Sequence, residues 1–333
     1  MGQPSRLSLA LKAGDVALPE DGRIAVFGPR AGMDLSALPA GSCHVITGMK
    51  PDHDHFAAQG FDCATAPEGR YGAAVVCVAR ARALSESMIA KAAAVTDGPV
   101  IVDGAKTDGI EALLRACRQR AALGPVLSKA HGKLFVFPAG LGFRDWARDA
   151  PQTVEGGFVT SPGIFSADGI DPGSALLADH LPERLGAHVA DLGAGWGYLS
   201  ARALSCDGIE DLHLVEADHA ALDCARRNVL DARARFYWED VLAWTAPRAL
   251  DTIITNPPYH TGRSPDPGLG RAFIRAAARS LAPKGQLFLV ANRHLPYESE
   301  LESHFAEVGE MTGNARLKLL HAARPRHKAR KTG

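Results

Sequence analysis

The chain has 333 residues, of which 46% are hydrophobic and 22% are charged, and its 37 basic side chains equal its 37 acidic ones in number. This length allows two domains of about 100–200 residues each, and the composition excludes a largely disordered chain. No apolar stretch approaches the roughly 20 residues of a membrane-spanning helix, and the first residues lack the features of a secretory signal. We therefore expect a globular protein without a membrane anchor.

The strand-like and helical patterns alternate along the whole chain, which favours parallel sheets joined by crossover helices. In the first half we expect strands at 23–28, 43–48, 73–79, 98–104 and 132–138, and helices at 83–95 and 109–122. In the second half we expect strands at 188–195, 212–217, 234–240, 251–256 and 286–292, and helices at 174–184, 196–206, 219–230 and 270–281. The halves share order and length, which predicts an α/β protein of two tandem, doubly wound Rossmann-like domains. We place their boundary within the aperiodic stretch 143–165, giving domains 1–150 and 151–333.

The cysteines and histidines offer neither a disulfide framework nor a clear metal site. The six cysteines are scattered and form no C-x-x-C pair, which is typical of reduced thiols in a cytoplasmic protein. His53 and His55 flank Asp54, but no third ligand stands at a suitable spacing. We therefore expect a solvated loop at 51–56 and no bound metal.

Charge is distributed unevenly along the chain. Residues 1–150 hold 17 Lys and Arg against 15 Asp and Glu, whereas residues 151–315 hold 13 against 22. The last 18 residues hold seven basic side chains and no acidic one. Such a basic tail either contacts the phosphates of a nucleic acid or is a frayed, solvated terminus, and the composition leaves both readings open.

The two copies differ at the carboxyl ends of their strands, where open α/β sheets bind their ligands. The first strand of the second copy runs into "DLGAGWG" (191–197), whereas that of the first copy runs into "FGPRAGM" (27–33). Similarly, "TNPPYHTG" (255–262) has "CVARARAL" (77–84) as its counterpart. The second copy is therefore the candidate for chemistry, and the first is a scaffold or a binding surface.

The turn at 191–197 and the strand ends beside it predict a nucleotide pocket. Its three glycines let the backbone approach a ligand closely: Gly193, Gly195 and Gly197. Asp191, just before them, would repel a diphosphate but attract a cationic ligand segment. Glu216 ends the next strand, where an acid commonly holds the ribose hydroxyls, and Asp240 follows the third strand, where it could accept from an adenine amino group. S-adenosylmethionine fits this pattern, whereas NAD and ATP do not.

The segment "NPPY" (256–259) ends a strand with two rigid prolines between an amide and an aromatic ring. The Asn256 side-chain oxygen and the Pro257 carbonyl can grip the N–H groups of a planar amine, and Pro258 keeps them aimed. Tyr259 offers a ring face on which a base can stack. We therefore expect Asn256, Pro257, Pro258 and Tyr259 to hold an amine for in-line methyl transfer.

With these residues, the chain resembles the bacterial ribosomal RNA small-subunit guanine-N2 methyltransferases and their large-subunit relatives. The family motif, Asn-Pro-Pro-aromatic-His, is present as "NPPYH" (256–260). The stretch "GIFSADGIDPGSALL" (163–177) resembles the family's approach to the cofactor site, and "LVANRHLPYESELESHF" (289–305) resembles its segment after the fifth strand. The resemblance covers about residues 163–320.

The resemblance implies methylation of a guanine N2 in ribosomal RNA, with 16S RNA or the small subunit as partner. It implies that Phe165 and Asp171 lie near the methionine end of the cofactor. It also implies that 1–150 is a degenerate methyltransferase-like domain that recognises RNA or supports the catalytic copy. We expect the basic tail and the arginines of "VARAR" (78–82) to contact phosphates.

The sequence leaves two alternatives open. Tyr259 stands where the family usually has Phe, and "NPPY" is shared with protein-glutamine and adenine-N6 methyltransferases. A protein-glutamine methyltransferase is therefore one alternative. The other is a non-catalytic RNA-binding factor for ribosome assembly, which would predict a damaged motif, yet every polar position of the pocket is present.

Overall fold

The computed structural model describes residues 5–147, 151–258, 260–261, 264–265 and 267–326. The chain divides into two compact units, Met1–Ala150 and Pro151–Gly333, and each is built on its own seven-stranded sheet.

The sheet of the first unit has the strand order β3-β2-β1-β4-β5-β7-β6. The pairs from β3 to β5 are parallel, and β7 is antiparallel to both β5 and β6. The strands are β1 (Ile24–Phe27), β2 (Cys43–Ile46), β3 (Asp62–Ala64), β4 (Ala73–Cys77), β5 (Pro99–Ala105), β6 (Val126–Lys129) and β7 (Gly132–Pro138).

The sheet of the second unit repeats this topology in the order β12-β11-β10-β13-β16-β18-β17. Its last two strands are again antiparallel to their neighbours. The strands are β10 (His188–Leu192), β11 (Asp211–Glu216), β12 (Ala234–Trp238), β13 (Leu250–Thr255), β16 (Leu281–Asn292), β17 (Phe305–Gly313) and β18 (Leu317–Pro325). Two short antiparallel pairs complete the unit: β8 (Gln152–Thr153) with β9 (Val159–Thr160), and β14 (His260–Thr261) with β15 (Ser264–Pro265). The prediction of two tandem doubly wound α/β domains is confirmed.

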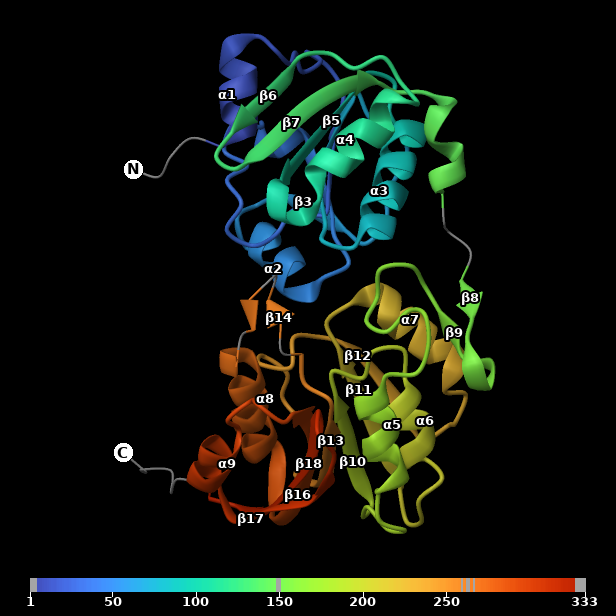
Figure 1. Ribbon diagram of the computed structural model, residues 1–333, viewed down its shortest axis with the longest axis vertical. Helices are drawn as coiled ribbons and strands as arrows, with labels where there is room; N and C mark the ends of the chain where they lie inside the picture. The colour runs from blue at the N-terminus through green and yellow to red at the C-terminus, as the bar shows by residue number, and fades with distance from the viewer. Residues whose placement is uncertain (1–4, 148–150, 259, 262–263, 266, 327–333) are drawn as a thin grey trace. The chain divides into compact units, whose positions relative to one another are not determined.

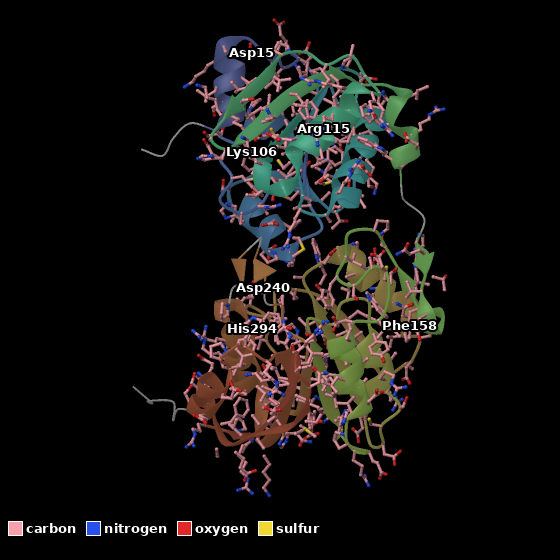
Figure 2. The ribbon with its side chains drawn as sticks, viewed as in Figure 1. Asp15, Lys106, Arg115, Phe158, Asp240 and His294 are labelled. Atoms are coloured by element: carbon pink, nitrogen blue, oxygen red, sulfur yellow. The ribbon has the colours of Figure 1, made fainter. Side chains whose placement is uncertain are left out.

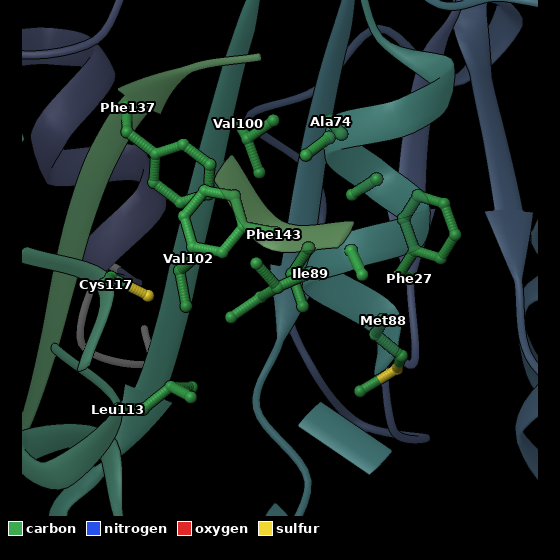
Figure 3. Close-up of a cluster of buried hydrophobic side chains, with 14 of the residues drawn as sticks. Phe27, Ala74, Met88, Ile89, Val100, Val102, Leu113, Cys117, Phe137 and Phe143 are labelled. Carbon is green, nitrogen blue, oxygen red and sulfur yellow. The ribbon is translucent and has the colours of Figure 1, made fainter. Parts of the chain in front are cut away.

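Helices cover both faces of the first sheet (Figure 1). Alternate strand residues face opposite layers: Phe27 packs with the layer of α3 (Arg82–Val95) and α4 (Ile110–Arg118), and Val26 with that of α1 (Arg6–Ala13) and α2 (Lys50–Ala58). Figure 3 shows the first of these layers, in which Ile89 and Leu113 from the helices face side chains of the sheet. Because parallel strands are buried on both faces, they read as continuous apolar runs in the sequence.

The second sheet is covered in the same way. On one face lie α5 (Pro172–Asp179), α6 (Tyr198–Ala203) and α7 (His219–Asn228), and on the other lie α8 (Pro267–Ser280) and α9 (Glu298–His304). The residues of β10 divide accordingly, since Leu192 packs toward α8 and Val189 toward α5 and α6. Because Asp191 stands two residues after Val189, it lies on the same face of the sheet, on the side of α6.

Every strand and helix expected from the sequence is present, with shifted ends, but several elements were not anticipated. These are β3, β6, β17, β18, α1, α2 and α9, together with the short pairs β8–β9 and β14–β15. The outer strands β3, β6 and β17 expose many of their side chains, so they lack the apolar run that marks a buried strand.

The prediction of a solvated loop at 51–56 is wrong, because these residues lie within helix α2. Pro51 stands in its first turn, where a proline is tolerated, and Asp52 lies at the positive end of the helix. Phe56 is fully buried in the core and fixes the helix to the sheet. Among the described residues, no group of His, Cys, Asp and Glu is arranged to hold a metal ion.

The reading of the last 18 residues as a frayed terminus is wrong for 317–325. These residues form β18, which pairs with β16 on one side and β17 on the other. Lys318 is 3% exposed and its Nζ lies 2.5 Å from a carboxylate oxygen of Glu298, while Arg324 lies 3.2 Å from Glu307. These two cations therefore have carboxylate partners within the same unit, and the rest of the basic tail, 327–333, lies outside the described residues.

No helix among the described residues is both long enough and apolar enough to cross a membrane. All six cysteines are free thiols, and four of them are buried.

Candidate functional site

A pocket opens at the carboxyl ends of β10 and β13, where the sequence predicted a ligand site. It is lined by Phe165, Ser166, Asp171, Ser174, Gly193, Ala194, Gly195, Trp196, Tyr198, Leu199 and Asn256. Five of the predicted site residues are thus brought together, from segments up to 91 positions apart in the sequence (165 to 256). Phe165 is 58% exposed at this site, which is unusual for a large aromatic side chain.

The glycine-rich turn after β10 adopts the left-handed backbone conformation that favours glycine. Gly193, Gly195 and Gly197 have φ angles of 75°, 56° and 88°. A Cβ atom on Gly195 would meet nothing within 4 Å, so this part of the turn faces open space. A Cβ atom on Gly197 would instead lie 3.0 Å from Val229, so Gly197 lets the turn pack closely on the layer beneath it.

Asp191 is fully buried beneath the turn and does not line the pocket directly. Its Oδ2 accepts a hydrogen bond from the Ser200 hydroxyl of α6 at 2.7 Å, whereas its Oδ1 has no partner among the described residues. Burial, and to a lesser degree the nearby Glu216, raise the pKa of Asp191 to about 7. An unpartnered buried carboxylate oxygen is costly, and a cationic ligand in the pocket would lower that cost.

Glu216 ends β11 and is hydrogen-bonded to the glycine turn. Its two oxygens accept from the backbone N–H groups of Gly195 at 2.7 Å and of Asp218 at 2.8 Å. Burial raises the pKa of Glu216 to about 7, while the N–H donors act in the opposite direction. Asp240, labelled in Figure 2, follows β12 and accepts from the Leu242 N–H at 2.9 Å. Neither acid lines the pocket, and both lie at neighbouring strand ends along the same edge.

Asn256 follows β13 directly and lies in the pocket wall. Its side-chain nitrogen donates to Asp171 Oδ2 at 2.8 Å and to the Ser174 hydroxyl at 2.9 Å. Pro257 is buried and Pro258 is exposed. Tyr259, the fourth member of the predicted motif, lies outside the described residues.

The segment before α5 is attached to the glycine turn by one amide side chain. Asn228, at the end of α7, exchanges two hydrogen bonds with the backbone of Val159 and donates a third to the Trp196 carbonyl at 2.7 Å. Phe158, labelled in Figure 2, packs against Trp196 and Tyr198 with ring centroids 5.2 and 5.6 Å apart. These contacts hold the segment that carries Phe165 and Asp171 beside the turn.

Sequence reasoning missed Ser174, Ser166, Ala194 and Leu199 as pocket residues. For Ser174 a signal was available, because "DPGS" (171–174) has an N-cap acid followed by a proline, which is typical of a helix start. Helix α5 begins there, at Pro172, with Asp171 as its N-cap.

Three features together define a methyltransferase domain. They are a Rossmann-like sheet, an open glycine turn with acids at the neighbouring strand ends, and an Asn-Pro-Pro segment after the fourth strand. Residues 155–321 match the family model of the methyltransferase small domain. Ribosomal RNA small subunit methyltransferase C of Pseudomonas paraeruginosa is 32% identical over 276 residues, which cover 78% of this chain and 81% of that protein. The chain belongs to the ribosomal RNA small subunit methyltransferase C family.

Two further proteins show how far the similarity extends. The enzyme of the same name from Hahella chejuensis is 38% identical over 167 residues, about half of each chain (50% of this one and 48% of that one). The solved structure of the T. thermophilus 16S rRNA N2 G1207 methyltransferase (RsmC), in complex with AdoMet and guanosine, superposes with a TM-score of 0.78 at 25% identity. That superposition covers 97% of this chain and 93% of the other, so the similarity includes both units.

Proposed function

We propose that this protein transfers a methyl group from S-adenosylmethionine to the N2 amine of a guanine in 16S ribosomal RNA. The observation that carries the proposal is the Asn256 side chain, whose nitrogen is fixed by Asp171 and Ser174 at the edge of the pocket. The similarity over both units to an enzyme named for 16S rRNA N2 G1207 supports the same substrate class. The corresponding guanine is the first candidate for the target nucleotide.

The pocket fits S-adenosylmethionine, which supplies an electrophilic methyl group on a sulfonium cation. Gly195 leaves open space beside the turn, and Asp191 has a buried carboxylate oxygen that a cationic ligand would stabilise. In this assignment Glu216 holds the ribose hydroxyls and Asp240 accepts from the adenine amino group. Phe165 and Asp171 lie near the methionine end, and Gly193, Gly197 and Asn256 complete the cofactor-binding residues of this assignment.

The chain's own groups act on the target amine by position and by hydrogen bonding. The amine of guanine is a weak nucleophile because its lone pair is delocalised into the ring. The Asn256 oxygen and the Pro257 carbonyl accept its two N–H groups, which fixes its plane and concentrates the lone pair on nitrogen. Pro258 restricts the backbone that presents these acceptors, and Tyr259 offers a stacking surface. The proton leaves after attack, so no strong base is required.

We assign residues 151–333 as the catalytic domain with a basic tail, and residues 1–150 as a degenerate methyltransferase-like domain that recognises RNA or supports its partner. Arg80 and Arg82 remain our candidates for phosphate contacts in the first domain. Arg82 is well exposed, although its Nε also lies 2.7 Å from Glu86. Because ribosomal RNA is the substrate, the proposal includes a cytoplasmic location, with which six free thiols agree.

The proposal is tested with labelled S-adenosylmethionine and ribosomal material from cells that lack this gene. Purified small subunits, large subunits and naked 16S and 23S RNA are incubated separately with the protein, and the labelled nucleoside is identified by mass spectrometry. We expect N2-methylguanosine in 16S RNA, and the preferred form of the substrate follows from the relative rates.

Two results would contradict the proposal. Label in a protein fraction, with every RNA unlabelled, would support the protein-glutamine alternative. RNA binding without any methyl transfer would support the non-catalytic assembly factor. Asn256→Ala, assayed in parallel, identifies label that does not depend on the proposed site.

A further inference from the structure

We propose that Asp171 and Ser174 are positioning residues that clamp the Asn256 amide, so that its oxygen is presented to the target amine as a strengthened acceptor. This inference rests on the proposed function and deepens it. It assigns Asp171 a task toward Asn256, in place of a contact with the cofactor alone.

The first support is the direction of the hydrogen bonds around Asn256. Its Nδ2 lies 2.8 Å from Asp171 Oδ2 and 2.9 Å from Ser174 Oγ, so both N–H groups of the amide have acceptors. A carboxylate can only accept, so the amide nitrogen and not the oxygen must face Asp171. A flipped amide would set its oxygen against the carboxylate. The oxygen therefore points away from Asp171, on the other branch of the planar amide.

The second support is that the clamp is itself held rigidly. Asp171 Oδ2 also accepts from the Ser174 backbone N–H at 2.8 Å, as the N-cap of α5, and Ser174 is 8% exposed. A Cβ atom on Gly173 would lie 2.9 Å from Asp171 Oδ2 and 3.6 Å from Asn256 Nδ2. The absence of a side chain at Gly173 is thus what leaves room for the contact between Asp171 and Asn256.

The third support is the backbone that follows Asn256. Strand β13 ends at Thr255, and the two residues that follow Asn256, Pro257 and Pro258, have no N–H group to donate. The backbone cannot anchor this segment by the ladder bonds that hold a strand. The side chain of Asn256 anchors the segment instead. It is hydrogen-bonded to the start of helix α5, to Asp171 (85 positions earlier) and to Ser174 (82 positions earlier).

The clamp also has an electronic consequence. When a carboxylate accepts from an amide N–H, it draws positive charge toward the nitrogen side and increases the negative charge on the amide oxygen. A more negative Asn256 oxygen is a better acceptor for the N–H groups of an amine that becomes positively charged during methyl transfer. Asp171 therefore acts through Asn256 and needs no contact with the base.

The test uses substitutions at Asp171 that separate capping from clamping. Asp171→Ser keeps an N-cap hydroxyl but is too short to hold Asn256, and Asp171→Asn keeps both the cap and an acceptor but removes the charge. We expect kcat on 16S RNA to fall about tenfold to a hundredfold in Asp171→Ser and by less in Asp171→Asn. Ser174→Ala, which leaves the carboxylate in place, should have the smallest effect. The Tm should stay near the wild-type value in Asp171→Ser, and the Kd for S-adenosylmethionine should change by a smaller factor than kcat.

Two controls make the outcome decisive. Asp179→Ser removes an exposed carboxylate from the same helix, 3.5 Å from Arg202, and should leave kcat unchanged. In an Asn256→Ala background, Asp171→Ser should cause little further loss, because both substitutions remove the same oriented acceptor.

A wild-type kcat in Asp171→Ser, or equal losses with and without Asn256, would overturn the clamp. A loss confined to the Kd for S-adenosylmethionine would do the same and would return Asp171 to cofactor binding alone. Absence of N2-methylguanosine with the wild-type protein would instead contradict the proposed function, so the two failures are distinguishable.

Discussion

The two units share one topology, yet the turn that follows the first strand is built differently in each. In the second unit the Gly195 N–H donates to Glu216, which ends the neighbouring strand, and the turn faces open space. In the first unit the Ala31 N–H donates to Asp52 at 2.7 Å and the Gly32 N–H to His55 Nε2 at 3.1 Å, both from helix α2. The two backbone N–H groups of this turn are therefore already hydrogen-bonded to side chains of α2.

The fourth strand of each sheet shows the same contrast. After β13, Asn256 is clamped by side chains from a distant helix start. After β4, the backbone turns directly into α3, and Ser85 of that helix exchanges hydrogen bonds with the N–H and carbonyl of Ala79. The same buried sheet can therefore carry very different loops, and the hydrogen bonds within those loops decide whether its carboxyl edge is open to a ligand.

The largest effect that this comparison predicts is at Asn256. Asn256→Ala removes an acceptor that is needed when the amine becomes positively charged, and we expect kcat to fall by about a hundredfold to a thousandfold. The Kd for S-adenosylmethionine should change by a much smaller factor than kcat. Single-turnover methylation of 16S RNA and calorimetric binding measure the two quantities, and a kcat within a few-fold of wild type would contradict the role of Asn256.

A substitution in the first unit should affect stability rather than chemistry. Arg6 Nε lies 2.5 Å from the mostly buried Asp103 carboxylate, whose pKa burial raises. Arg6→Ala leaves that carboxylate without its cationic partner and should cost about 3 kcal/mol of unfolding free energy.

The matched control for Arg6→Ala is Arg23→Ala. This substitution breaks the exposed pair with Asp62 and should cost less than about 1 kcal/mol. Urea unfolding followed by fluorescence measures both variants, and equal losses would show that burial does not distinguish the two pairs.

The two acids that accept from the glycine-containing turns, Glu216 and Asp52, give the sharpest test of which unit binds the cofactor. Glu216→Ala should weaken S-adenosylmethionine binding by about thirtyfold, because a charge-assisted pair of hydrogen bonds to the ribose is lost. Asp52→Ala, which removes the helix α2 carboxylate that accepts from the Ala31 N–H of the first turn, should leave the affinity unchanged. Isothermal titration of the full chain should give one site per chain, and a second site, or a loss caused by Asp52→Ala, would show that the first turn also binds.

The affinity for S-adenosylmethionine should depend on pH, and the effect of each carboxyl is the smallest of the four. Without ligand, burial holds the pKa of Asp191 and Glu216 at about 7 each. A cationic ligand favours the ionised forms, so affinity should rise roughly tenfold between pH 6 and pH 7.5 for each titrating carboxyl. Asp191→Asn should flatten the part of this profile that Asp191 contributes.

The raised pKa values of Asp191 and Glu216 also determine how the folding stability of the ligand-free protein changes with pH. The folded-state pKa values lie above the ordinary values of 3.8 and 4.5, so the folded state binds these protons more tightly than the unfolded one. Stability from the protonated carboxyls is therefore lost as the pH rises from about 4 to about 7. Thermal unfolding at several pH values checks this direction, and S-adenosylmethionine should oppose the loss.

Much of this protein could be predicted from its sequence. The buried strands are recognisable as apolar runs because parallel strands are covered on both faces. The turn at 191–197 is recognisable because its glycines and its acid stand in one short stretch. The Asn-Pro-Pro segment stands out because no strand or helix accommodates two prolines. These signals are local, and local patterns follow from backbone and side-chain geometry over a few residues.

The tertiary structure alone decided the rest. Whether 317–325 is a tail or an inner strand depends on pairing with β16 and β17, and whether 51–56 is a loop or a helix depends on the burial of Phe56. The direction of the Asn256 amide depends on Asp171 and Ser174, more than 80 positions earlier in the chain. Such contacts leave no periodic trace in the sequence, because they join segments whose spacing the fold sets and no local rule constrains.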